Sequence, residues 1–180
     1  MNRFKATLQG GLFLLVVLIA TSAFASPKAG TARPNLKLVD AWARTYDTSE
    51  VGARPLLVLY EDKDSANDNK AFKDELSKLA KGDAYKAKVV LLAVADLQGY
   101  DYWPTRGFVK DAMMSESRKA GTPIYCDWDG GVAKAFSVKR GVSNVMLYGK
   151  DGKLLFAYEG AMPEASRKDV LEKLRVQVQE

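Results

Sequence analysis

Few residues in this chain could carry out chemistry, and their types set narrow limits on what that chemistry is. Histidine is absent, and Cys126 is the single cysteine. These absences exclude a Ser-His-Asp or Cys-His catalytic site, an intramolecular disulfide and a cysteine-based zinc site. Three candidates remain, which are the thiol of Cys126, an acidic turn from Glu61 to Asp68, and an aromatic loop from Tyr100 to Pro104.

The thiol of Cys126 has two interpretations. It could be the redox group of a thiol-dependent oxidoreductase or peroxidase, or it could be a small apolar residue that packs on a strand beside Ile124. A reactive thiol needs a lowered pKa, whereas the neighbouring Asp127 and Asp129 would raise the pKa of this thiol. The sequence shows no base near Cys126 that could deprotonate it. The sequence favours the packing role, and the single-thiol enzyme is the alternative function.

The acidic turn is the second candidate, and its polar residues are Glu61, Asp62, Asp64, Ser65 and Asp68. Carboxylates so closely spaced could bind a hard cation such as calcium, but the Gly and the bidentate Glu of an EF-hand loop are missing. The same residues could cap a helix N-terminus, with Asn67 or Asp68 as the N-cap. We expect capping, no metal and no other cofactor, and we keep cation binding as the second alternative. Ser65 has no accompanying base that would make it a nucleophile.

The aromatic loop is the third candidate, with Tyr100, Tyr102, Trp103 and Pro104 close together. Such a cluster could recognise a peptide or a protein, because tryptophan and tyrosine dominate binding hot spots. It could equally close the core over the helix that follows. The two roles are nearly balanced, with the core role slightly preferred.

Apolar periodicity indicates which elements position these candidates. Apolar runs predict strands at 36–42, 56–60, 87–95, 122–126, 145–148 and 154–158. Amphipathic patterns predict helices at 67–80, at 105–119 and from about Pro163 onward, with a helical turn at 132–136. The first helix would carry an ion pair between Asp74 and Lys78. The second would carry a stripe with a mostly apolar face, made of Phe108, Val109, Ala112, Met113 and Glu116.

The order of these elements predicts the fold class. Strands that alternate with helices pair in parallel, and helices then cover both faces of the sheet. The turn at 149–152 joins two apolar runs and predicts an antiparallel hairpin at the end of the sheet. The expected fold is therefore α/β, a mixed sheet flanked by helices.

The first residues predict an exported protein. Arg3 and Lys5 precede an apolar run at 11–20 and an A-x-A site at 23–25. We expect a cleaved signal peptide at 1–25, a flexible lead-in at 26–35 and one domain at 36–180, with an uncleaved anchor as the alternative for the first segment. The mature protein would be periplasmic or secreted and no longer tied to a membrane. Its mildly basic charge is dispersed among acidic residues, so we expect no nucleic-acid partner.

Three segments resemble the redoxin branch of the thioredoxin superfamily. Residues 34–40, PNLKLVD, look like the opening of such domains, and 127–138, DWDGGVAKAFSV, are similar to the family's DxDGxVAKAYGV stretch. Gly141-Val142, an apolar strand and then 150–153, KDGK, resemble its GVPTTFLIDKDGK stretch. The resemblance implies a thioredoxin-like fold over nearly all of the region after residue 26.

The chain departs from that family at its chemistry. Ser65 and Asp68 stand where the family has its two active-site cysteines, and Ser143 stands at the family's cis-proline position, where we expect a trans bond. In this respect the chain is similar to YtfJ-type periplasmic proteins. The loss of all these groups indicates a domain that no longer exchanges disulfides. We therefore expect a binding or accessory module whose partner is another periplasmic protein or a peptide. The expected binding surface combines the acidic turn with the neighbouring loops and comprises Glu61, Asp62, Asp64, Ser65, Asp68, Tyr102, Trp103 and Ser143.

Overall fold

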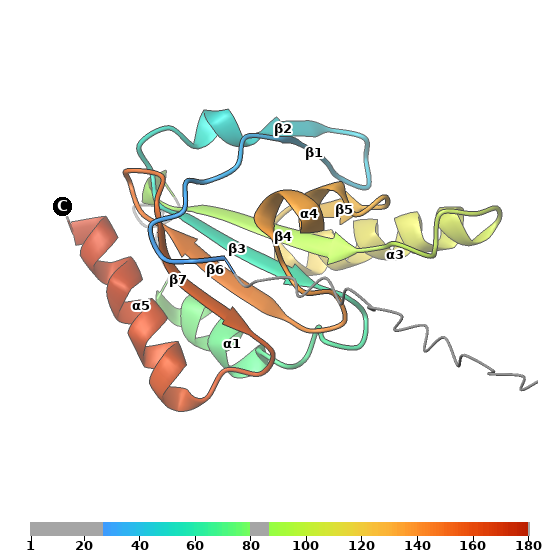
Figure 1. Cartoon of the computed structure of the whole chain (residues 1–180). Helices are drawn as coiled ribbons and strands as arrows, with labels where there is room; N and C mark the ends of the chain where they lie inside the picture. The colour runs from blue at the N-terminus through green and yellow to red at the C-terminus, as the bar shows by residue number, and fades with distance from the viewer. Residues whose placement is uncertain (1–26, 80–86, 180) are drawn as a thin grey trace, which may run out of the picture.

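A five-stranded mixed sheet in the order β5-β4-β3-β6-β7 forms the centre of the computed structural model, which describes residues 27–79 and 87–179 (Figure 1). Three strands run parallel, and they are β3 (Leu56–Glu61), β4 (Val90–Asp96) and β5 (Ile124–Asp127). The fourth strand, β6 (Asn144–Tyr148), runs antiparallel to β3, and the edge strand β7 (Leu154–Glu159) runs antiparallel to β6. This is the predicted thioredoxin-like arrangement, and the predicted hairpin joins β6 to β7.

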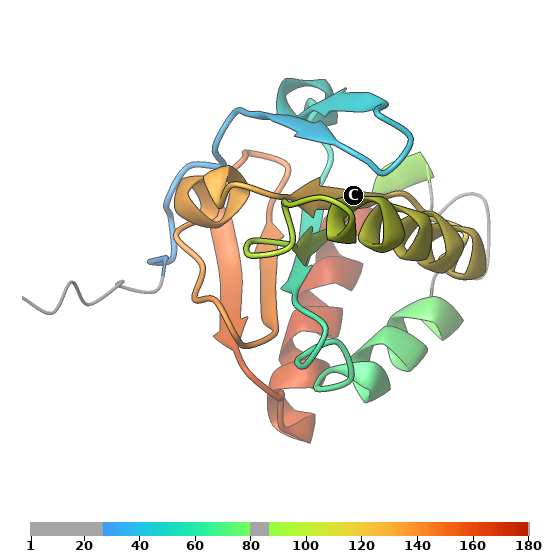
Figure 2. The ribbon, with the colours of Figure 1, turned by 90° about the vertical axis from the view of Figure 1, so that its right-hand side faces the viewer.

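Helices and a small hairpin cover the two faces of the sheet (Figures 1 and 2). One face packs against α1 (Lys70–Leu79), α3 (Thr105–Ala120) and α5 (Glu164–Gln179). The other face packs against α4 (Gly131–Phe136) and the segment that contains β1 (Lys37–Val39), β2 (Thr45–Asp47) and the 3-10 helix η1 (Thr48–Val51). Both faces of the sheet are therefore covered, as the prediction required.

The central strand β3 explains why its sequence is apolar without interruption. Leu56, Val58 and Tyr60 point into the core under α4, whereas Leu57 and Leu59 point into the core under α1 and α5. Side chains of a strand alternate between faces, so a strand buried on both sides needs apolar residues at every position. The strand ends where the chain becomes polar, at Glu61.

Several predicted boundaries and contacts are wrong. The first helix begins at Lys70 and not at Asn67, and its ion pair joins Lys70 to Asp74 at 2.9 Å instead of Asp74 to Lys78. The strand predicted from residue 87 begins at Val90. The hairpin of β1 and β2 was not predicted as two strands, because each has only three residues and little apolar alternation.

The buried face of α3 also differs from the predicted stripe. Val109, Met113 and Met114 pack against the sheet, whereas Phe108 is exposed. Ser117 is the fully buried residue of the helix, because its hydroxyl accepts a hydrogen bond from the Ile124 N–H at 3.0 Å. The apolar pattern of the sequence could not predict this burial, because the buried residue is a serine.

The N-terminal part of the described chain lies against the β6–β7 hairpin. The Gly30 N–H donates to the Leu154 carbonyl at 2.9 Å, and the Arg33 N–H donates to the Gly152 carbonyl at 2.7 Å. The segment predicted as a flexible lead-in therefore adds backbone hydrogen bonds beside β7. The predicted signal peptide and Ala80 lie outside the described residues. Within 27–79 and 87–179, no helix has the length and apolar character needed to cross a bilayer.

The packing of α5 predicts a sharp contrast between two of its positions. Leu174 is fully buried and Val176 is 47% exposed. We expect Leu174→Ala to lower the free energy of unfolding by about 2–5 kcal/mol, because it leaves a cavity under the helix. The matched Val176→Ala should change it by less than about 0.5 kcal/mol. Urea unfolding followed by circular dichroism measures both, and equal effects would contradict this placement of α5.

Candidate functional site

Polar residues gather where the parallel strands end. β3 ends at Glu61, β4 at Asp96 and β5 at Asp127, while β6 begins beside β3 at Asn144, directly after Ser143. Ligands of open α/β sheets bind outside the carboxyl ends of the parallel strands. This end of the sheet is therefore the place to look for a functional site.

Glu61 lies at the centre of one polar network on this edge. One of its carboxylate oxygens accepts a hydrogen bond from the Ser143 hydroxyl at 2.8 Å. The other forms an ion pair with the Lys73 ammonium group at 2.8 Å. Lys73 also donates to the Ala66 carbonyl, so helix α1 holds both the carboxylate and the acidic turn.

Asn69 joins that network to the other side of the domain. Its side-chain amide donates to the Ser143 hydroxyl at 2.8 Å and to the Gly160 carbonyl at 2.9 Å. Its carbonyl oxygen accepts from the Met162 N–H at 2.9 Å. Asn69 and Ser143 are both buried, and every polar atom of their side chains has a partner. The network therefore leaves no free hydroxyl for catalysis.

The acidic turn is closed by its own residues. One Asp62 carboxylate oxygen accepts from the Ser65 N–H at 2.8 Å, from the Ser65 hydroxyl at 2.7 Å and from the Asp64 N–H at 3.1 Å. Burial raises the pKa of Asp62, but these hydrogen bonds outweigh burial and hold the pKa below its ordinary value. Helix α1 starts several residues later, so the turn stabilises itself rather than the helix.

The expected capping of α1 is therefore wrong in detail. Among the described residues, no side-chain cap from Asn67 or Asp68 to the helix is found. Asp64 and Asp68 are exposed, whereas Glu61 and Asp62 turn toward Lys73 and Ser65. No cluster of three metal-ligating side chains occurs in the part of the chain that the structure describes.

Ser65 and Ser143 occupy the positions that the resemblance assigned to a thiol and to the cis-proline. Ser65 is buried in the turn, and Ser143 is 0% exposed under Glu61 and Asn69. Within the described residues the only cis peptide is Trp103-Pro104, so the bond before Ser143 is trans, as expected.

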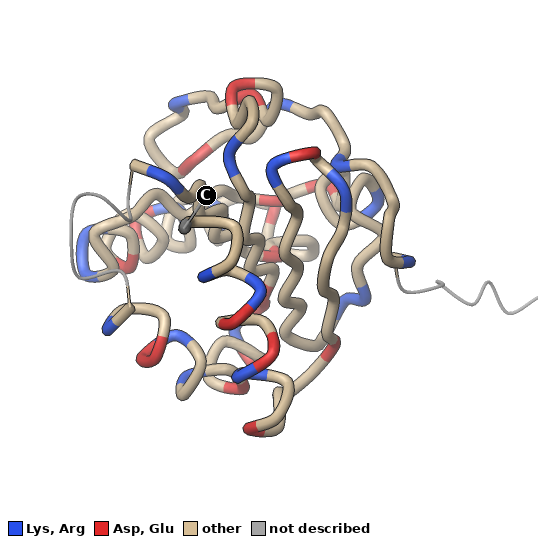
Figure 3. The backbone as a smooth tube through the Cα atoms, turned by 90° about the vertical axis from the view of Figure 1, so that its left-hand side faces the viewer, with Lys and Arg blue, Asp and Glu red and all other residues tan. Residues whose placement is uncertain are grey.

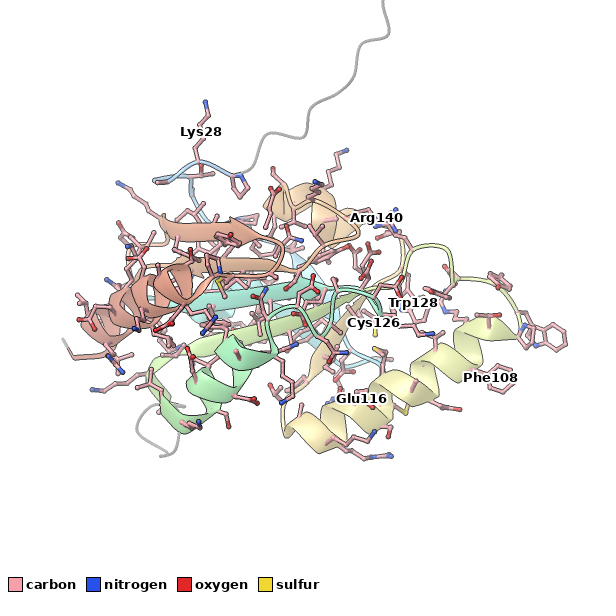
Figure 4. All side chains as sticks on the ribbon, turned by 90° about the horizontal axis from the view of Figure 1, so that it is seen from below. Lys28, Phe108, Glu116, Cys126, Trp128 and Arg140 are labelled. Atoms are coloured by element: carbon pink, nitrogen blue, oxygen red, sulfur yellow. The ribbon has the colours of Figure 1, made fainter. Side chains whose placement is uncertain are left out.

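Cys126 lies away from this network. It is buried on β5 with Ala41 and Leu97, beside Trp128 and under α3 (Figure 4). Burial and then the charge of Asp40 raise the pKa of the thiol to about 11, although Arg106 and Lys110 oppose the shift. The expected direction is right, but the acid responsible is Asp40 and not Asp127 or Asp129.

Asp127 has a different task on the opposite face of the sheet. Its carboxylate accepts from the Tyr60 hydroxyl at 3.0 Å and from the N–H groups of Val132 and Ala133 at 3.2 and 2.9 Å. It thereby fixes the start of α4 against β3. Burial and the charge of Asp127 raise the pKa of Tyr60, so this phenol stays protonated.

The loop that precedes β6, residues 139–143, is also held in place by hydrogen bonds. The Arg140 guanidinium binds both oxygens of buried Asp96, at 2.7 and 3.1 Å. The Asn144 amide donates to the carbonyls of Lys139 and Val142 at 2.7 and 2.8 Å. Residues 139–143 are thus held by Asp96 and Asn144, which lie on the same face of the sheet as Tyr60.

The aromatic loop does not close the core. Trp103 is 91% exposed and Tyr102 is 59% exposed, so the slightly preferred core role is wrong for these rings. Phe108 on the first turns of α3 also points away from the sheet (Figure 4). Among the described residues, no hydrogen bond, ion pair or ring contact links Tyr102 or Trp103 to the acidic turn.

The structure therefore divides the predicted site residues into three groups. The first group is buried or half-buried and forms internal hydrogen bonds; it comprises Glu61, Asp62, Ser65 and Ser143. The second group is exposed on the turn and comprises Asp64 and Asp68. The third group projects from a separate loop and comprises Tyr102 and Trp103. Sequence reasoning missed Asn69, Lys73 and Arg140. The spacing of Lys73 three residues after Lys70 on a surface helix gave no sign that it pairs with Glu61.

Several solved structures have an architecture similar to that of this chain. The exposed lipoprotein thioredoxin Etrx1 of Streptococcus pneumoniae is 19% identical, with a TM-score of 0.57 over 79% of this chain and 98% of that one. A secreted disulfide oxidoreductase of Mycobacterium tuberculosis is 16% identical, with a TM-score of 0.54 over 78% and 95%. A hypothetical protein of Sinorhizobium meliloti is 18% identical, with a TM-score of 0.63 over 86% of both chains. At these identities the likeness shows the fold, which is thioredoxin-like.

The sequence also matches a family profile. No curated protein matches it significantly. The profile described as "Bacterial protein of unknown function (YtfJ_HI0045)" matches residues 67–177, which include α1, the loop at 139–143 and most of α5. Because this match spans more than half of the sequence, the chain belongs to the YtfJ_HI0045 family.

Proposed function

We propose that this protein is an exported thioredoxin-fold module that binds another protein or a peptide and does not exchange disulfides. One observation carries the proposal. The positions of the two thiols and of the cis-proline hold Ser65, Asp68 and Ser143, and both serines are buried in hydrogen bonds. The hydroxyl groups of both serines form hydrogen bonds only within the protein, so neither is available as a nucleophile that could attack a substrate.

The proposed contact surface is smaller than the set of site residues predicted from sequence. Glu61 and Ser143 are internal, so they shape the surface without touching a partner. Trp103 and Tyr102 are the exposed anchors, because large aromatic rings contribute most to protein interfaces. Asp64 and Asp68 are exposed on the turn at the same end of the sheet and would contact polar groups of the partner.

Export rests on the N-terminal pattern and on the relatives. A basic start, a short apolar run and an A-x-A site precede the described residues. Two thioredoxin-like proteins of similar structure are named as an exposed lipoprotein and as a secreted oxidoreductase. We therefore place the proposed partner in the periplasm or outside the cell.

The buried thiol gives a direct test against the alternative enzyme. We expect Cys126 in the folded protein to react with iodoacetamide only at alkaline pH, with a rate that rises toward a midpoint of about 11. An unfolded cysteine should show a midpoint of about 8.5. Alkylation followed by mass spectrometry, with and without urea, measures both. Rapid reaction at neutral pH, or peroxide or disulfide turnover that Cys126→Ser abolishes, would favour the single-thiol enzyme instead.

Site-specific crosslinking tests the proposed surface. We expect Trp103→p-benzoylphenylalanine, irradiated in intact cells, to give one discrete protein adduct. Adding Tyr102→Ala should reduce the adduct about fivefold or more, because truncating a hot spot costs more than about 1 kcal/mol. The same photoreactive residue at exposed Val176 is the matched control. No adduct at position 103, or equal adducts at both positions, would contradict the surface.

A further inference from the structure

A cavity with a basic lining lies at the opposite end of the sheet from the proposed partner surface. Its volume is about 240 Å³, and its lining includes Arg54, Lys88, Lys150, Gln177 and Val178. These residues come from the segments before β3 and β4, from the turn after β6 and from the last turn of α5. Figure 3 looks onto this end and shows Lys and Arg segments around the C-terminal end of α5.

The three cations of this cavity lie together, and no acidic side chain of the described residues is bound to any of them. Within the described residues, none of Arg54, Lys88 and Lys150 forms an ion pair, although ten other Lys and Arg side chains do. Among the described residues, no carboxylate side chain belongs to the cavity lining. The positive charge of the cavity therefore has no acidic partner in that part of the chain.

Hydrogen bonds to neutral carbonyl groups hold two of these cations in place. The Arg54 guanidinium donates to the carbonyls of Val51 at 3.1 Å and Glu50 at 3.0 Å. The Lys88 ammonium group donates to the Val178 carbonyl at 3.0 Å. Both side chains keep further N–H groups for a ligand, because a guanidinium has five and an ammonium three. The cations are thus positioned before any ligand arrives.

A structural role accounts for only part of this arrangement. Lys88 stabilises the carbonyl end of α5, as a cation at a helix C-terminus does. Arg54 bonds to carbonyls of its own turn, and Lys150 has no side-chain partner among the described residues. Nearby Asp151 is exposed, and its carboxylate accepts from the Lys153 N–H at 3.0 Å; within the described residues it forms no ion pair with Lys150.

We propose that this cavity binds a small oxyanion, the carboxylate or phosphate head group of a small molecule. Arg54, Lys88 and Lys150 would bind its oxygens by charge-assisted hydrogen bonds. The Gln177 side chain accepts from the Lys150 N–H at 3.0 Å and thereby fixes the turn that carries Lys150. The apolar part of the lining would contact the remainder of the ligand. This site is independent of the aromatic loop and of the proposed partner.

Titration of the ¹⁵N-labelled protein with inorganic phosphate and with acetate, at constant ionic strength kept with sodium chloride, tests the proposal. We expect saturable shifts of amide signals confined to the cavity residues. Lys150→Gln should weaken binding about tenfold, because it removes one charged hydrogen bond. The matched Lys134→Gln, an exposed lysine on α4, should leave binding unchanged. Saturation by phosphate alone would assign a phosphate group, and saturation by acetate would assign a carboxylate.

Three outcomes would overturn the proposal. Shifts that grow linearly with anion concentration would show unspecific screening. Equal weakening by Lys134→Gln and Lys150→Gln would show a general effect of charge. Binding that appears only in Glu180→Gln would show that the cavity serves the carboxylate of Glu180 and not a separate ligand. Circular dichroism of each variant would verify that it is folded.

Discussion

The hydroxyl group of Ser143 is the junction on which the end of the sheet depends. It donates to Glu61 at the end of β3 and accepts from Asn69 just before α1. Asn69 in turn holds Gly160 and Met162 between β7 and α5. A buried polar group without a partner costs about 1–3 kcal/mol, and more when it is charged. Each member of this network therefore depends on the others, and the carboxylate of Glu61 also needs Lys73.

The network lies at the end of the sheet where open α/β folds bind their ligands. In the thioredoxin-like fold that the comparisons show, the carboxyl ends of β3 and the neighbouring strands are the natural site for a ligand. Here the same edge is filled by Ser65, Ser143 and their partners, while Arg140 and Asp96 fasten the adjoining loop. The exposed acids of the turn and the aromatic loop remain accessible at this end, and the proposed partner contact rests on them.

The sequence was sufficient for the fold and insufficient for the site. Continuous apolar runs such as Leu56–Tyr60 require burial on both faces, and the hairpin turn at 149–152 fixes the order of the last strands, so the sheet could be predicted. The β1–β2 hairpin could not, because three-residue strands carry no periodic pattern. The roles of Asn69 and Lys73 arise from residues that lie far away in the sequence, and no local pattern reveals such partners. The exposure of Trp103 was missed for a related reason, since an aromatic residue in a loop has no periodicity that tells core from surface.

A double-mutant cycle on Ser143 and Asn69 tests the account most directly. Urea unfolding of Ser143→Ala, Asn69→Ala and the double variant gives the coupling free energy, with the exposed Ser77→Ala as the control. If the buried network holds the sheet edge, Ser143→Ala lowers the free energy of unfolding by about 1–3 kcal/mol, and the pair is coupled by about 0.5–3 kcal/mol. A loss within about 0.5 kcal/mol of that in Ser77→Ala, together with additive effects of the two substitutions, would contradict the account.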